Sequence, residues 1–125
     1  TEAKGYAGEM RSACGAGKKS LSRIRAALSE TQDAMGVTAL NDWTARYYQH
    51  ANRLAVLHFL TCHSIPVVLV DVFFHGRTDS DDRSPNTPEE WEPVLSERSE
   101  YLGLTGESEL EKRVFHAFID ISGAR

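Results

Sequence analysis

A long apolar helix followed at once by an apolar strand is the feature that most constrains the fold of this chain. Residues 42–63 place apolar side chains on three neighbouring rows at helical spacing, so the second half of this helix is predicted to be buried. Residues 66–74 are almost continuously apolar, which is typical of a strand covered on both faces. A buried helix that leads through a short loop into such a strand is half of an α/β crossover. Polar residues interrupt the first half of the helix, namely Gln49, Asn52 and Arg53.

Length and composition indicate one ordinary globular domain, residues 1–125. The chain has 125 residues, 41% of them hydrophobic and 26% charged, and can bury a core without disulfides or metals. No apolar run approaches the ~20 residues of a membrane span. Residues 1–4 lack the hydrophobic stretch of a secretory leader. The two cysteines, Cys14 and Cys62, form no disulfide framework, so we expect a cytoplasmic protein with reduced thiols.

The charge of the chain is unevenly distributed. The formal net charge is −4, which is not the signature of a strongly basic nucleic-acid-binding domain. Residues 1–29 nevertheless contain six bases and two acids, whereas residues 77–112 contain four bases and eleven acids. A basic front and an acidic back can orient a polyanion, and the simpler alternative is two solvated faces of different charge.

The remaining patterns complete an α/β fold with a mixed sheet flanked by helices. The predicted helices lie near 20–35, 42–63 and 88–102, and the predicted strands near 66–75 and 114–122. Thr87 is a good N-cap for the third helix, Pro88 suits its first position, and Gly103 suits its C-terminal cap. Gly36 is a plausible stop for the first helix. The last strand alternates in hydropathy, which predicts one covered face at the edge of the sheet.

Two segments resemble ligand-binding loops but lack residues that those loops require. Residues 15–20 resemble a phosphate-binding loop, but Lys19 stands where a magnesium-binding Ser or Thr belongs. Residues 79–90 place acids at three positions of a calcium loop, but Ser84 replaces the required glycine. A solvated loop is the better interpretation of residues 79–90, and no nucleotide site is expected at residues 15–20.

The residues that suggest chemistry are Glu2 and Lys4. On a strand these side chains point to the same side, because side chains alternate with period two. A carboxylate there can hold Mg²⁺, and an ammonium beside it can activate water and stabilise charge on a phosphate. Alone, Glu-x-Lys is a very weak signal.

The context of this pair resembles a known superfamily. The order of Glu2-Ala3-Lys4, a buried helix with an inward polar cluster, and a hydrophobic strand is similar to that of the PD-(D/E)XK nucleases, which have the restriction-endonuclease-like fold. The specific part is the run Tyr48-Gln49-His50-Ala51-Asn52-Arg53-Leu54-Ala55, which resembles a bacterial group within that fold. The resemblance covers nearly the whole chain.

The resemblance implies a role for several positions of this chain. Glu2 would be the metal-binding carboxylate, Lys4 the catalytic lysine, and Gln49 the helix glutamine beside the metal or the scissile phosphate. Arg53, one turn further along the helix, would contact a phosphate. Asn52 would orient Gln49 or Lys4, and Tyr47 or Tyr48 would close the edge of the site. The implied activity is Mg²⁺-dependent hydrolysis of phosphodiesters in DNA or RNA.

The chain departs from the family pattern at its start. The family's metal-binding Asp lies on a strand before the Glu-x-Lys strand, and no Asp precedes Glu2, so this chain looks like the C-terminal part of the fold without its first strands. A bare sheet edge there is a route to a homo-oligomer. The alternative function is a non-catalytic nuclease-fold module that binds protein or nucleic acid. The nuclease interpretation predicts that Gln49 lies within hydrogen-bonding or one-water reach of Glu2 or Lys4.

Overall fold

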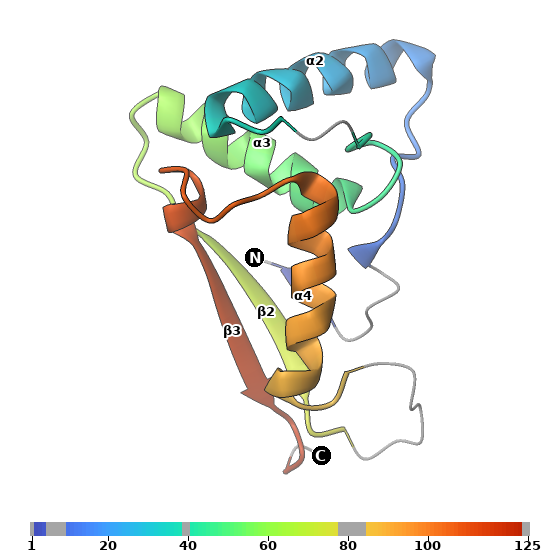
Figure 1. Ribbon diagram of the computed structural model, residues 1–125, viewed down its shortest axis with the longest axis vertical. Helices are drawn as coiled ribbons and strands as arrows, with labels where there is room; N and C mark the ends of the chain where they lie inside the picture. The colour runs from blue at the N-terminus through green and yellow to red at the C-terminus, as the bar shows by residue number, and fades with distance from the viewer. Residues whose placement is uncertain (1, 5–9, 39–40, 78–84, 124–125) are drawn as a thin grey trace.

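The computed structural model describes residues 2–4, 10–38, 41–77 and 85–123, with the backbone alone described for the first of these segments. The chain is a mixed α/β protein (Figure 1). Its elements in chain order are β1 (Glu2–Lys4), α2 (Lys18–Met35), α3 (Tyr48–Cys62), β2 (Leu69–His75), α4 (Pro88–Leu102), the short 3₁₀ helix η1 (Glu111–Arg113) and β3 (Val114–Asp120). No helix among the described residues is long and apolar enough to cross a membrane.

The described strands form one sheet in the order β1-β2-β3, and both strand pairs are parallel. Parallel neighbours require long crossovers, which explains why helices separate every strand from the next. Asp71 of β2 lies at the centre of the sheet, since it pairs with Glu2 on one side and with His116 on the other. The expected α/β class and the position of β3 at an edge of the described sheet are confirmed, whereas the expectation of a mixed sheet is not, because every described strand pair is parallel.

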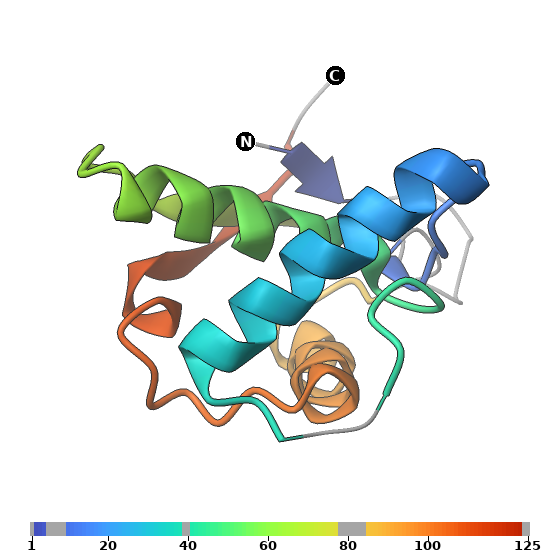
Figure 2. The same cartoon turned by 90° about the horizontal axis from the view of Figure 1, so that it is seen from above.

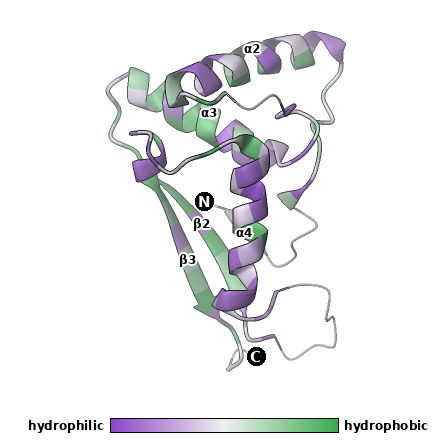
Figure 3. Cartoon of the chain, in the orientation of Figure 1, coloured by the Kyte–Doolittle hydropathy of each residue, from purple (hydrophilic) through white to green (hydrophobic). Residues whose placement is uncertain are grey.

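Burial on β2 is one-sided rather than equal on both faces. Asp71 and Phe73 are buried, whereas the residues that alternate with them, Val70, Val72 and Phe74, are only partly buried. Alternation sends these two groups to opposite faces. On β3 only two side chains are partly covered, so its expected well-covered face is wrong, and Phe115, Phe118 and Ile119 expose 51%, 37% and 43% of their surface. In Figure 3 both strands are largely hydrophobic, although the described helices contact only one face of the sheet.

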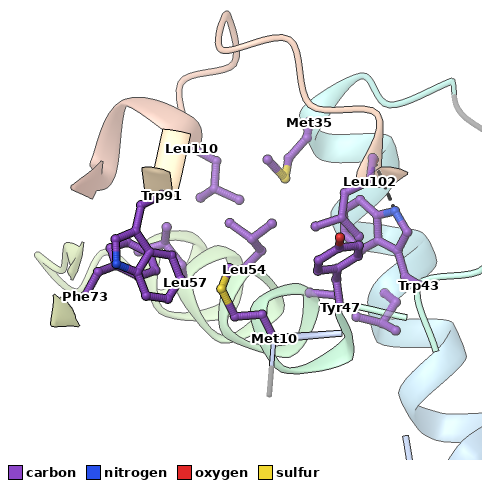
Figure 4. Packing of buried hydrophobic residues seen from close by; sticks show 12 residues of the cluster. Met10, Met35, Trp43, Tyr47, Leu54, Leu57, Phe73, Trp91, Leu102 and Leu110 are labelled. Carbon is purple, nitrogen blue, oxygen red and sulfur yellow. Dashed lines mark hydrogen bonds between the residues drawn. The ribbon is translucent and has the colours of Figure 1, made fainter. Parts of the chain in front are cut away.

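The core lies where α3 and α4 meet β2 (Figure 4). Trp91, Tyr47, Phe73, Leu54 and Leu102 are fully buried in it. The rings of Phe73 and Trp91 lie 4.9 Å apart, and the Trp91 indole donates to the carbonyl of Phe74 at 3.1 Å. Each buried aromatic or leucine side chain contributes about 1.5–3 kcal/mol by leaving water, so this contact fixes α4 against the sheet.

The helix that follows Asp42 begins later than its sequence predicts. Asp42 does accept a hydrogen bond from the backbone N–H of Thr44 at 2.8 Å, but this closes an isolated turn. Asp side chains compete with the helix for nearby N–H groups in this way. α3 begins only at Tyr48, after Tyr47 adopts the left-handed conformation (φ 55°) with its side chain fully buried. The start predicted at Asp42 is therefore wrong.

The ends of the other helices follow their capping residues. Thr87 accepts the N–H of Glu90, and Pro88 is the first residue of α4. Gly36 and Gly103 end α2 and α4 in the left-handed conformation (φ 69° and 74°), which glycine adopts without strain.

Candidate functional site

The Glu-x-Lys segment forms β1, the strand beside β2. Glu2 pairs with Asp71 and Lys4 with Phe73. Figures 1 and 2 both place β1 next to the N-terminal half of α3. The side chains of Glu2 and Lys4 lie outside the described part of the structure, so the expected reach between them and Gln49 stays a prediction.

The structure brings together two of the three polar residues of α3. The Oε1 atom of Gln49 accepts a long hydrogen bond of 3.5 Å from Nη2 of Arg53, one helical turn away. Both side chains are partly buried, whereas Asn52 is exposed. Burial lowers the pKa of Arg53 and the nearby Asp71 carboxylate opposes that shift. Gln49 and Arg53 therefore form one polar group that faces the sheet, and Asn52 is not part of it.

Tyr48, the third substrate-binding candidate, faces a different neighbour. Its side chain is partly buried, and burial, together with the adjacent Cys14 thiol, raises the pKa of its hydroxyl. The backbone N–H of Cys14 also donates to the carbonyl of Thr44 at 2.8 Å, which holds this segment against the start of α3. Tyr48 thus borders the loop before α2.

Sequence reasoning missed a buried polar cluster around Asp71, which we call the Asp71 cluster (His50, Asp71, Arg98 and His116). The Oδ2 atom of Asp71 accepts a hydrogen bond from Nη2 of Arg98 at 3.0 Å. Nδ1 of His50 lies 3.6 Å and Nε2 of His116 lies 3.8 Å from the same oxygen. The four residues come from α3, β2, α4 and β3, so the cluster exists only in the complete fold.

The charges of the Asp71 cluster are set by burial. Desolvation lowers the pKa of His50 well below its ordinary value, helped by the positive charge of Arg98. Desolvation also lowers the pKa of His116, which is 37% exposed, and here the Asp71 carboxylate opposes the shift. His50 is therefore neutral at pH 7, and its contact with Asp71 is dipolar rather than an ion pair. The cluster holds one carboxylate and one guanidinium, flanked by two imidazoles.

One signal in the sequence pointed to this cluster. Asp71 interrupts an otherwise apolar buried strand, and Arg98 lies on the apolar face of its helix with Trp91 and Leu102. Buried charges in folded proteins are normally paired, so these two oppositely charged residues could have been predicted to contact each other. Nothing local indicates His50, which lies beside the polar pair Gln49 and Arg53.

Two hollows adjoin the Asp71 cluster. A small pocket of about 140 Å³ reaches His50 and Arg98. A larger groove of about 700 Å³ runs between α4 and β3. Ser99, Leu104 and His116 line both, so the groove leads to the buried polar residues. The pocket offers a neutral imidazole and a guanidinium, groups that can accept or donate hydrogen bonds or stabilise a negative charge.

No family model, curated protein or solved structure matches this chain. Its functional interpretation therefore depends on the residues and their geometry, together with the resemblance of the motifs.

Proposed function

We propose that this chain carries a nuclease-type site of the PD-(D/E)XK kind, which hydrolyses phosphodiesters in DNA or RNA. The observation that carries the proposal is the position of β1. The strand that contains Glu2 and Lys4 pairs in parallel with β2 and lies next to the half of α3 that bears Gln49 and Arg53. The order β1, α3, β2 resembles the strand, helix and strand of the restriction-endonuclease-like core, with α2 as an additional helix between β1 and α3.

The proposed roles follow from the chemistry of the side chains. Lys4 and Arg53 attract the phosphate and offset charge on its oxygens during attack by water. Gln49 orients Arg53 through their hydrogen bond and faces the water or the phosphate with its amide. Glu2 accepts a proton from the attacking water. Tyr48 borders the substrate at the start of α3, while the exposed Asn52 meets nucleic acid at the rim.

Magnesium is implied by the resemblance alone. Among the residues whose side chains are described, no group of three His, Cys, Asp or Glu residues could hold a metal ion. Asp71 is the neighbour of Glu2 in the backbone register. Its carboxylate accepts a hydrogen bond from Arg98 at 3.0 Å. The described residues therefore do not fit a magnesium site by themselves, and the roles above assign no step to a metal.

The second candidate function is a module that binds nucleic acid or protein without cleavage. The pairing of Asp71 with Arg98 favours it, because this leaves Glu2 as the other carboxylate on β1 and β2. Arg53 and Lys4 would then bind a phosphate backbone without hydrolysing it.

A cleavage assay separates the two candidates. The chain is incubated with labelled DNA and RNA, with and without Mg²⁺, beside Glu2→Ala and Lys4→Ala. We expect cleavage by the parent to fall at least about a hundredfold in both variants, since each loses a group that acts on the reacting phosphate. Lys112→Ala, which removes an exposed cation far along the chain, serves as the control.

The outcomes are distinct. If Glu2→Ala or Lys4→Ala cleaves as well as the parent, the proposed site is wrong. If the parent binds DNA or RNA without cleaving it, and Arg53→Ala weakens that binding more than Lys112→Ala does, the non-catalytic module is supported. A parent that neither cleaves nor binds nucleic acid overturns both functions.

A further inference from the structure

The groove between α4 and β3 is separate from the proposed nuclease site. Its helix wall includes Glu89, Glu92, Leu95 and Glu100, and its strand wall includes Phe118. In chain order, these helix positions follow one side of α4, which begins beside the buried residues at Leu95 and extends to the exposed glutamates. At about 700 Å³ the groove has the size of a ligand-binding cleft.

The rim of the groove is acidic. Glu89, Glu92 and Glu100 are exposed, and none of them forms a salt bridge with another described residue. The opposite side of α4 differs, because there Glu97 pairs with Arg11 at 3.1 Å and with Arg46 at 3.2 Å. One side of the helix is therefore neutralised within the chain, and the groove side keeps three negative charges for a partner.

The floor of the groove is apolar and incompletely covered. Leu95 and Leu104 are partly buried, and Phe118 stacks on Phe73 at 5.4 Å yet remains 37% exposed. α4 covers β2 through Trp91, whereas it reaches β3 mainly through Arg98, which lies 3.4 Å from His116, and five of the seven residues of β3 are exposed. In α/β layers helices pack side by side over neighbouring strands, so the space over β3 has the position of one more helix.

The small pocket next to the groove contains a buried hydrogen-bond donor, the Nε atom of Arg98. Arg98 lines the small pocket behind His116, and its side chain is only 6% exposed. Its Nε atom is buried and has no hydrogen-bond partner among the described residues. Buried polar groups in folded proteins normally have a partner, so the small pocket that adjoins the groove contains a donor without one among the described residues.

We propose that the groove binds a basic amphipathic helix of another protein. Its apolar face packs on Leu95, Leu104 and Phe118, and its lysine or arginine side chains reach the glutamates of the rim. This is helix-in-groove recognition with complementary charge. The three unpaired glutamates disfavour a nucleic acid in the same place because they repel phosphates.

The test measures binding of a defined probe by fluorescence anisotropy. The probe is a labelled 14-residue Lys/Leu peptide patterned as an amphipathic helix, and a scrambled peptide of the same composition is its counterpart. We expect Glu92→Gln with Glu100→Gln to weaken binding of the patterned peptide about tenfold, since two charge contacts are lost. The matched control, Glu30→Gln with Glu107→Gln, removes the same charge from exposed positions outside the groove and should change binding less than about twofold.

Backbone NMR of the parent locates the peptide independently of any variant. Peptide-induced shifts that concentrate on α4 and β3 support the proposal. Shifts elsewhere, equal binding of the scrambled peptide, or equal losses in the two double variants would overturn it. Self-association of the chain through the groove, seen as a dimer in sedimentation that Glu92→Gln with Glu100→Gln strengthens, would also overturn it. Because the cleavage assay does not involve these glutamates, this proposal and the proposed nuclease can fail separately.

Discussion

Two consecutive residues of α4 make arginine–carboxylate pairs of almost equal length in opposite surroundings. Glu97 accepts from Arg11 at 3.1 Å, with side chains 45% and 39% exposed. Arg98 donates to Asp71 at 3.0 Å, with side chains 6% and 9% exposed. Water screens the first pair and competes for its hydrogen bonds, whereas the second pair has lost most of its hydration. Distance alone therefore says little about how strongly either pair stabilises the fold.

Breaking the buried pair should have the largest effect. Arg98→Met leaves the Asp71 carboxylate buried without its cation, and we expect a loss of about 3–5 kcal/mol in the free energy of unfolding, measured by urea denaturation. Arg98→Met combined with Asp71→Leu removes both charges and should recover much of that loss. If the double variant is no more stable than Arg98→Met alone, the uncompensated charge is not the cause.

The protonation of His50 should have the next largest effect. Its pKa in the folded state lies well below the ordinary 6.5, so between these values the unfolded chain binds more protons than the folded chain. The stabilisation is complete above about pH 6.5 and is lost as the pH falls below it. We expect urea denaturation to show about 1 kcal/mol less stability at pH 5.5 than at pH 7 from this residue.

His50→Gln is the control for this pH dependence. The variant keeps a polar side chain but cannot be protonated, and His116 continues to titrate in both proteins. The loss of stability between pH 7 and 5.5 should therefore become smaller in the variant. An unchanged loss would mean that the pKa of His50 is the same in the folded and unfolded chains. The exposed Glu97 pair should not respond in this range, because a hydrogen bond with Tyr47, together with Arg11 and Arg46, lowers the pKa of a carboxyl group that already titrates at lower pH.

Breaking the exposed pair should have the smallest effect. Glu97→Gln removes the partner of both Arg11 and Arg46, yet we expect the free energy of unfolding to fall by only about 0.5 kcal/mol, and by less in high salt. Urea denaturation at two salt concentrations measures both quantities. A loss as large as that of Arg98→Met would abolish the contrast between the two sides of α4.

Local signals predicted most elements of this fold and none of its long-range polar contacts. The bounds of α4 follow directly from Thr87, Pro88 and Gly103. The start of α3 was mispredicted because Asp42 is equally suited to cap a turn, and no local rule shows that Tyr47 will be buried in a left-handed conformation. Sequence reasoning therefore succeeds where neighbouring residues decide the backbone.

In the candidate site, too, the sequence predicted contacts between neighbouring residues but not contacts between distant ones. The helical spacing of Gln49 and Arg53 predicted that they face the same way, and they share a hydrogen bond. The Asp71 cluster was missed because its four residues come from four elements, and only the packed sheet brings them together. Asp71 and Arg98 could have been suspected as buried charges, but their partners depend on the topology.

The parallel order of the sheet also has a kinetic consequence. β1, which contains Glu2, is synthesised before α2 and α3, and its partner Asp71 follows after both helices. His116, the neighbour of Asp71 on the other side, follows only after α4. Every ladder in the described sheet therefore closes a long loop, which slows folding. During synthesis α2 and α3 are complete before β2 emerges, so neither ladder of the described sheet can form until then. The chain thus spends its most aggregation-prone interval before the Asp71 cluster can form.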